Sequence, residues 1–203
     1  MAGDLRGCFG VLVVDGLIVA ELESGHASTA WLIGAEDVIR PWEMDRLSLT
    51  RGVRWSALRP TRVVRLDRSF YARSRDDPEA LNGVLSGAAR TGQWLLAKSL
   101  VISSPLIEER LLLLFALYGE RWGRRTAQGV SLQLPLTHRL LAALCGARRP
   151  SVSHALRKLE RKGLLSCPGR GEWELHSPLG CEPAMGAREY AAALGFGTEP
   201  VGG

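Results

Sequence analysis

The sequence predicts an α+β fold with an N-terminal β domain, a long central helix and a C-terminal helix-turn-helix followed by a β-hairpin. Short apolar or alternating runs punctuated by glycine and proline fill the first third of the 203-residue chain, which is typical of strands. A long segment without proline follows, and the last third holds two short amphipathic helices around a glycine. The predicted boundaries are 1–76 for the β domain, 77–103 for the long helix, 104–178 for the helix-turn-helix domain and 179–203 for a flexible tail.

The composition is that of an ordinary globular protein, with 46% hydrophobic and 23% charged residues. No apolar run approaches the roughly 20 residues that a membrane-spanning helix needs. The N-terminal residues also lack the layout of a secretory signal. We therefore expect a cytoplasmic protein that has no membrane partner.

Cysteine and histidine usage argues against a metal site or a catalytic site. The four cysteines form no CxxC pair, so the sequence predicts no disulfide framework, no metal and no cofactor. Cys167, His176 and Cys181 have a spacing that matches no common metal site. The sequence contains no nucleophile elbow, glycine-rich phosphate loop or HExxH arrangement, so no enzymatic activity is predicted.

Positive charge is concentrated in the C-terminal part of the chain. Eleven basic and three acidic residues lie between Arg121 and His176, so this segment carries +8 and the remainder −3, because the whole chain carries +5. Such an asymmetry is expected when one domain meets phosphates and the other does not. A solvated basic face explains the charge by itself equally well, so the choice between the two depends on motifs.

Five runs predict strands in the first third, and turn residues separate them. The clearest turn signal is Asp15-Gly16, because an Asp-Gly pair between apolar runs supplies the positive φ angles of a tight hairpin. Pro60 separates the last two runs. Five short strands at this spacing indicate a sandwich or a small barrel. The runs are 9–14, 17–22, 29–33, 53–58 and 61–66.

One long helix is predicted from Pro78, a residue favoured at the first helical position, to the interruption at Pro105. Seven of its residues recur at alternating four- and three-residue steps and therefore lie along one seam, as in a coiled coil. Such a seam predicts a homodimer, and packing of the helix against the chain's own β domain is the alternative. The seam residues are Leu81, Leu85, Ala88, Gly92, Leu95, Ser99 and Ile102.

A second helix is predicted from Leu106 to Gly119. It is apolar on nearly all sides, so we expect it to be buried. A basic turn from Arg121 to Arg125 is expected next, and then a short strand over 130–134 that ends at Pro135.

Residues 136–162 predict a short helix, a tight turn and a second helix. Thr137 can cap the first helix by accepting a hydrogen bond from a backbone N–H. Gly146 supplies a turn conformation that a residue with a Cβ tolerates poorly. The inner stripe of the second helix consists of Val152, Ala155, Leu156 and Leu159.

The outer face of the second helix, residues 149–162, is polar and basic, as expected of a helix that enters a DNA groove. Arg149 is the expected reader of guanine, because its planar fork matches the O6 and N7 acceptors. Residues 164–176 then predict a two-stranded wing with Arg170 at its tip, placed to meet a backbone phosphate. A solvated helix face is the alternative, above all at Arg161 and Lys162. The predicted DNA-binding residues are Thr137, Arg148, Arg149, Pro150, Ser151, Ser153, His154, Arg157 and Arg170.

The sequence resembles the CRP/FNR-type transcription regulators over most of its length. The strongest stretch is LPLTHRLLAALCGARRPSVSHALRKLERKGLL, and RLLLLFALYGERWG before it resembles the family's linking helix. The resemblance implies a cyclic-nucleotide-binding-like β-roll as sensor, a long dimerisation helix and a winged helix-turn-helix. It also implies a homodimer that binds an inverted repeat in double-stranded DNA near promoters, with RNA polymerase as a further partner. In this family the positions of Arg149, Pro150, Ser151 and His154 face DNA.

The sensor half departs from the best-known members of that family. The expected phosphate-binding cassette, a glycine-glutamate pair followed by arginine-serine, is absent, and Arg40-Pro41-Trp42-Glu43 stands near its place. Without those groups a cyclic phosphate loses its main polar anchor, so we expect no dependence on cyclic AMP. Clustered N-terminal cysteines for an iron–sulfur centre have no counterpart near Cys8. The sequence therefore names no small-molecule effector.

Two alternative functions remain open at this stage. One is a winged-helix module that binds proteins and not DNA. The other is a small-molecule-sensing regulator that still binds a cyclic nucleotide. The first predicts no salt-sensitive affinity for DNA, whereas DNA recognition predicts a steep fall of affinity with salt.

Overall fold

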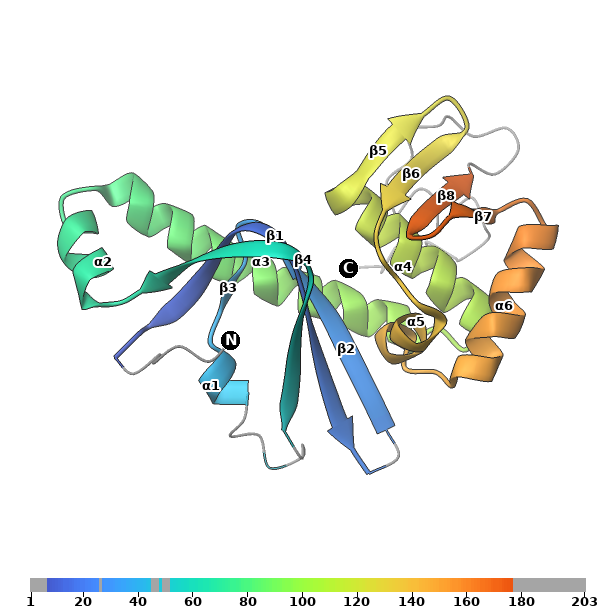
Figure 1. Ribbon diagram of the computed structural model, residues 1–203, viewed down its shortest axis with the longest axis horizontal. Coiled ribbons are helices and arrows are strands. Elements are labelled where there is room, and N and C mark those ends of the chain that lie inside the picture. The colour runs from blue at the N-terminus through green and yellow to red at the C-terminus, as the bar shows by residue number, and fades with distance from the viewer. Residues whose placement is uncertain (1–6, 26, 45–47, 49–51, 177–203) are drawn as a thin grey trace, which may run out of the picture. The chain divides into compact units, whose positions relative to one another are not determined.

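The computed structural model describes residues 7–25, 27–44, 48 and 52–176. The chain divides into two compact units between Leu96 and Ala97, which lie within one helix (Figure 1). Each unit is built around its own antiparallel sheet. The predicted α+β class is therefore confirmed, while the predicted flexible tail, residues 179–203, lies outside the described residues.

The sheet of the N-terminal unit is organised around one long central strand. β1 (Gly10–Ser24) pairs along one edge with β2 (Ala27–Gly34) and β3 (Val38–Ile39), and along the other edge with β4 (Val53–Leu66). Alternating apolar residues give this sheet a buried core, and the indole rings of Trp31, Trp42 and Trp55 pack against it. The core residues are Val11, Val13, Ile18, Ala20, Ile33 and Ile39.

The predicted hairpin at Asp15-Gly16 is wrong, because β1 runs through these residues without turning back. Gly16 does have a positive φ of 102°, but it lies opposite the Pro60 region of β4, and a Cβ on it would come within 2.4 Å of the Pro60 carbonyl oxygen. The β1–β4 register shifts between Val13 and Asp15 and again before Ile18. The glycine therefore serves a bulge in two paired strands. As a result, the four runs at 9–14, 17–22, 53–58 and 61–66 merge into β1 and β4.

Three helices accompany this sheet. α1 (Pro41–Met44) is a single turn, and α2 (Arg68–Ser74) is a helix that the sequence analysis did not predict. The Asp67 side chain caps α2 by accepting a hydrogen bond from the Phe70 N–H at 2.9 Å. α3 (Pro78–Ser103) confirms the predicted long helix. A Cβ at Gly87 would lie 2.5 Å from the Glu36 carbonyl oxygen, so this glycine lets α3 approach the turn before β3 closely.

The C-terminal unit combines three helices with a four-stranded sheet of order β5-β6-β8-β7. In chain order its elements after α3 are α4 (Ile107–Trp122), β5 (Gly123–Thr126), β6 (Gly129–Gln133), α5 (His138–Cys145), α6 (Arg149–Arg161), β7 (Leu165–Gly169) and β8 (Glu172–His176). Phe115 of α4 and Trp173 of β8 join helices and sheet, with ring centroids 4.9 Å apart. This arrangement is a winged helix-turn-helix.

The predicted helix end at Gly119 and the basic turn that follows it are wrong. α4 continues to Trp122, and Arg124 and Arg125 lie in β5. Gly119 lies inside the helix, and Val130 of β6 packs over it, since a Cβ there would lie 3.2 Å from the nearest Val130 methyl carbon. The N–H of Gly123 closes the helix by donating to the Gly119 carbonyl oxygen.

Among the described residues, no helix combines the length and the apolar character that would let it cross a membrane.

Candidate DNA interface

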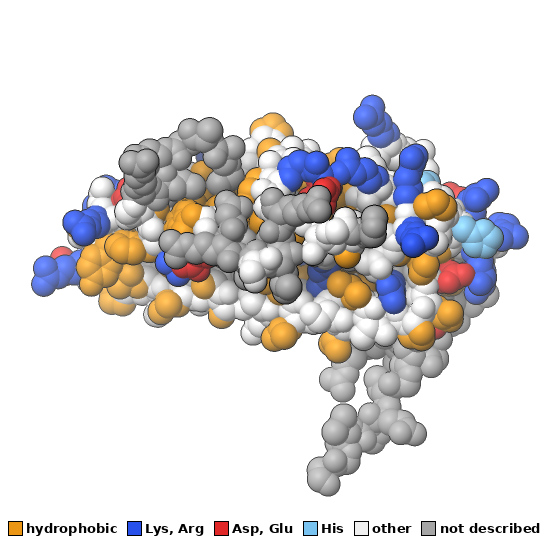
Figure 2. Space-filling model, turned by 90° about the horizontal axis from the view of Figure 1, so that it is seen from below, with side chains coloured by type: hydrophobic (Ala, Val, Ile, Leu, Met, Phe, Trp, Pro, Cys, Tyr) orange, Lys and Arg blue, Asp and Glu red, His pale blue; other side chains and the backbone are white. Residues whose placement is uncertain are grey.

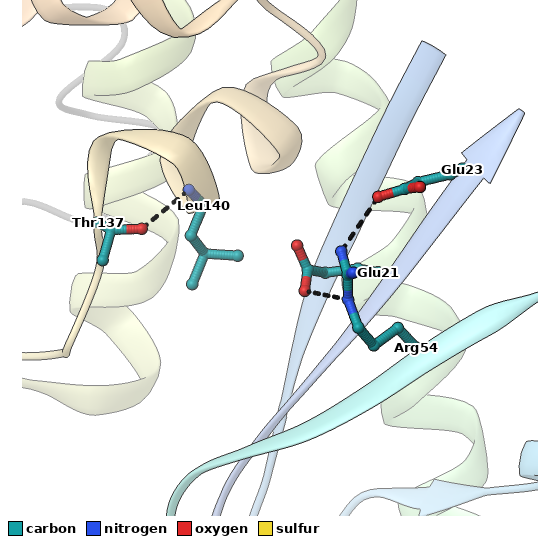
Figure 3. A network of polar contacts seen from close by, with 5 residues as sticks. All are labelled: Glu21, Glu23, Arg54, Thr137 and Leu140. Atoms are coloured by element: carbon teal, nitrogen blue, oxygen red, sulfur yellow. Dashed lines mark hydrogen bonds and ion pairs between the residues drawn. The ribbon is translucent and has the colours of Figure 1, made fainter. Parts of the chain in front are cut away.

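The turn between α5 and α6 has the geometry that the sequence predicted. Thr137 Oγ1 accepts a hydrogen bond from the Leu140 N–H at 3.2 Å and so caps α5 (Figure 3). Gly146 adopts the left-handed conformation, with φ 60° and ψ 41°. The Ala147 N–H then donates to the Ala142 carbonyl oxygen at 2.9 Å. The left-handed glycine and the bond from Ala147 end α5 sharply, so that the chain can start a second helix at once.

α6 presents one buried and one exposed face, as predicted. The inner stripe of Val152, Ala155, Leu156 and Leu159 is buried. The exposed face, which we call the α6 face, contains five exposed and two half-buried residues from the predicted DNA-binding set. The exposed residues are Arg148, Arg149, Pro150, His154 and Arg157, and the half-buried residues are Ser151 and Ser153.

Positive charge dominates the surface around α6. Figure 2 shows Lys, Arg and His side chains gathered at the end of the view where this helix lies. The first turn of α6 contains no acidic residue, and its N-cap Arg148 provides no side-chain cap. The backbone N–H groups of this turn therefore lack the kind of acceptor that Thr137 supplies to α5. Such a helix end favours a phosphate oxygen.

Two side chains of α4 hold the reading elements, and the sequence analysis missed both. Lys158 Nζ lies 2.7 Å from Glu108 Oε1, which ties α6 to the first turn of α4. The hydrogen bond from Lys158 is the main reason why the pKa of Glu108 is lowered. Arg110 donates through Nη1 to the carbonyl oxygens of Cys145 and Gly146, at 3.1 and 3.3 Å. Partners 35 to 50 positions apart leave no local sequence signal.

His138 adds a third link to this group. Its Nδ1 lies 2.9 Å from Ser153 Oγ and so joins the start of α5 to α6. One predicted DNA contact, Ser153, is thus already engaged with a neighbouring side chain.

β7 and β8 form the predicted wing. The Trp173 Nε1–H donates to the Leu134 carbonyl oxygen at 3.2 Å, and Trp173 and Leu175 are buried. Arg170 is exposed in the connecting turn, beside Gly171 with a φ of 79°. His176 Nε2 lies 2.8 Å from Ser166 Oγ. Within the described part of the chain no group of three side chains is arranged to hold a metal ion, and Cys181 lies outside that part.

The predicted dimer seam of α3 is exposed along most of its length. Leu85, Ala88, Gly92, Leu95 and Ser99 are exposed, whereas Leu81 and Ile102 are half-buried. Sequence periodicity selected Leu95, which is 40% exposed, but missed Leu96 and Leu100, which are 71% and 73% exposed. Leu96 and Leu100 lie four and eight residues after Gly92. They therefore lie on the same face of α3 as Gly92, the face that a partner helix would cover.

Two arginines of the N-terminal unit form ion pairs with carboxylates, and one of them, Arg40, stands near the sequence position expected for the phosphate-binding cassette. Arg40 Nη1 lies 2.8 Å from Glu43 Oε1 in α1. Arg54 on β4 contacts Glu21 Oε2 and Glu23 Oε1 on β1, each at 3.1 Å (Figure 3). These carboxylates raise the pKa of Arg54, with the hydrogen bond to Glu21 as the largest cause. Both arginines thus have carboxylate partners within the same unit.

Comparisons with known proteins agree with this geometry. Residues 109–179 match the model of the Crp-like helix-turn-helix domain. No curated protein matches the chain. Among solved structures, a CRP-family transcriptional regulator from Thermus thermophilus is 19% identical, with a TM-score of 0.64 over 96% of this chain and 90% of that chain. A cyclic nucleotide-binding domain containing protein from Listeria monocytogenes is 16% identical, with a TM-score of 0.67 over 85% and 82%.

FixK2 from Bradyrhizobium japonicum has the same fold, with 19% identity and a TM-score of 0.61 over 83% of each chain. At such identities the structures establish the fold, and the domain match identifies the helix-turn-helix part as Crp-like. The chain therefore carries a Crp-like helix-turn-helix domain at residues 109–179, and its fold is similar to that of a CRP-family transcriptional regulator.

Proposed function

We propose that this chain is a homodimeric, sequence-specific transcription regulator that reads an inverted repeat through α6 without depending on cyclic AMP. The observation that carries the proposal is the α6 face: exposed arginines on a helix whose first turn has no acidic residue and no side-chain cap. A major groove admits such a helix, and the first turn meets base edges and phosphates there.

The predicted DNA-binding residues divide into those that contact bases and those that contact the phosphate backbone. Arg149 reads guanine through two parallel hydrogen bonds, and His154 faces the neighbouring base pairs. Most of the remaining predicted residues fix the helix on the phosphate backbone, since side-chain hydroxyls, arginines and helix N-termini all bind phosphate oxygens. This second group consists of Thr137, Arg148, Ser151, Ser153, Arg157 and Arg170, whereas Pro150 has no hydrogen-bond donor and faces DNA without binding a phosphate.

Dimer formation through α3 supplies a second α6 helix for the other half-site. Exposed Leu85, Leu96 and Leu100 leave an apolar stripe on this helix that a second copy would cover. Two α6 helices would then meet half-sites about 34 Å apart, the spacing of one helical turn of DNA. A dimer bound near a promoter has RNA polymerase as its expected partner.

Independence from cyclic AMP is supported by the interior of the β domain. Trp31, Trp42 and Trp55 pack on the core face of the sheet, and Arg40 is held by Glu43. A regulator that still binds a cyclic nucleotide would need a polar anchor for the phosphate.

The experiment is selection of bound duplexes from a random DNA pool by the purified full chain, followed by titration in increasing salt. We expect enrichment of an inverted repeat and a linear fall of log affinity with log salt, with a slope of about −0.9 per neutralised phosphate. Addition of cyclic AMP should leave both results unchanged. Failure to enrich any duplex would favour the protein-binding winged-helix module, and a gain of affinity with cyclic AMP would contradict the sensor assignment.

A further inference from the structure

β4 is an edge strand with unusual exposure. It pairs with β1 over nearly its whole length, and no described strand pairs with its other edge. Residues 62–65 are all exposed. An open edge of this kind presents main-chain N–H and C=O groups to any extended segment that approaches it.

Hydrogen bonds of β1 show which main-chain groups point outward. The Val13 N–H donates to the Asp37 carbonyl oxygen at 2.9 Å, and the Val13 carbonyl oxygen accepts from the Glu36 N–H at 2.7 Å. Val13 therefore directs its main-chain groups away from β4, although it stands opposite Val63 in the register. In an antiparallel ladder such a pair is the non-hydrogen-bonded one. The N–H and C=O of Val63 consequently face the open edge.

A small cavity lies along the same edge. It measures about 180 Å³ and is lined by Ile18 of β1 together with five residues of β4: Trp55, Ser56, Ala57, Thr61 and Val63. A cavity of roughly 150 Å³ holds a benzene-sized group. The site is thus large enough for one apolar side chain of an added strand and too small for a nucleotide.

The positive charge of β4 determines which kind of added strand can bind to its open edge. The strand carries four arginines and no acidic residue. Arg54 is held by Glu21 and Glu23, while exposed Arg62 reaches Asp15 only at 3.9 Å, and such an exposed pair is worth little. A second copy of β4 would place arginines against arginines across the new ladder, which is unfavourable. The complementary partner is acidic.

We propose that the outer edge of β4, residues 59–66, binds an extended acidic segment of a partner protein as an added strand, with one apolar side chain of that segment in the cavity. Main-chain bonds to Val63 supply affinity, the cavity supplies register, and Arg59 and Arg62 select acidic side chains. This surface is separate from the α6 face, so its test does not depend on DNA binding.

The experiment uses the full chain as bait for a displayed library of random peptides of roughly ten residues, about the upper length of ordinary strands. We expect enrichment of peptides that alternate apolar and acidic residues. The best peptide should bind the double variant Arg59→Glu, Arg62→Glu at least about tenfold more weakly. A matched control, Arg75→Glu, changes an exposed arginine outside β4 and should leave binding unchanged.

N-methylation of the peptide backbone separates strand addition from simple charge attraction. It removes main-chain donors and keeps every charge, so we expect it to abolish binding. Unchanged thermal unfolding of the double variant shows that it is folded. Enrichment of peptides without acidic residues, equal binding to the double variant, or full binding of the N-methylated peptide would overturn the proposal.

Discussion

Glu108 of α4 and Lys158 of α6 form an ion pair, with Nζ and Oε1 2.7 Å apart, that holds the recognition helix on its scaffold. Lys158 is half-buried, and its pairing with Glu108 fixes the helix on α4. The pair thus fixes the position of the α6 face relative to the buried helix α4.

Glu108→Gln should lower the free energy of unfolding at pH 7 by up to about 1 kcal/mol, because Lys158 is 44% exposed and solvent weakens the pair. The pKa of Glu108 is lowered from its ordinary 4.5, so the stabilisation is present above pH 4.5 and is lost as the pH falls through the lower folded-state value. Urea titration of both proteins between pH 3 and 7 tests this. A difference that persists unchanged at the lowest pH would contradict it.

Leu96→Glu should dissociate the proposed dimer, since a carboxylate would replace an apolar contact between two α3 helices. Light scattering should report the mass of a monomer for this variant and of a dimer for the wild type. Tyr71→Glu places the same charge at an exposed apolar residue of α2, outside α3, and serves as the control. Retention of dimer mass by the Leu96 variant would show that this face is not the interface.

Lys98→Met should stabilise the protein at pH 7. Lys98 is 8% exposed, and burial lowers its pKa from 10.5 to about 8. Charging the amine therefore costs stability below pH 8, by up to about 3 kcal/mol, and this cost disappears as the pH rises through 10.5. The stability difference between variant and wild type should shrink over that interval. A destabilised Lys98 variant at pH 7 would refute the prediction.

Gly16→Ala should cost at least about 2 kcal/mol, because the residue has a positive φ and its Cβ would collide with the Pro60 carbonyl. Gly25→Ala is a matched control with a φ of 58° and no atom within 4 Å of the added Cβ. It should cost about 1 kcal/mol, the conformational strain by itself. Thermal unfolding of both variants measures the difference, and equal losses would argue against a close contact at the bulge.

Much of the C-terminal unit could be predicted from sequence because its signals are local. Thr137 and Gly146 determine the ends of α5 through bonds to residues within four positions, and the inner stripe of α6 follows from helical period. The strands of the N-terminal unit were harder to predict from sequence. Asp-Gly at 15–16 has the local signature of a hairpin. The glycine instead lies in a bulge of paired strands, because Pro60, more than forty positions away, approaches it closely.

The same reason explains what was missed at the site. Lys158 reads as one more cation on a basic helix until the fold brings Glu108 beside it. Arg110 lies in a helix that the sequence predicts to be apolar and buried, yet its side chain binds the carbonyls at the α5–α6 turn. Similarly, Leu96 and Leu100 are candidates for the dimer face because they are exposed, and the sequence pattern does not reveal that exposure.

The central claim, that α6 reads DNA through Arg149, is tested most directly by comparing the binding-site preferences of the wild type and Arg149→Ala over one random duplex pool. The account predicts that the variant loses about 1–3 kcal/mol of binding free energy and its preference at one base pair in each half-site. Arg157→Ala should weaken binding to all duplexes alike, since phosphate contacts carry no sequence information. An unchanged preference at every position in the Arg149 variant would contradict the account.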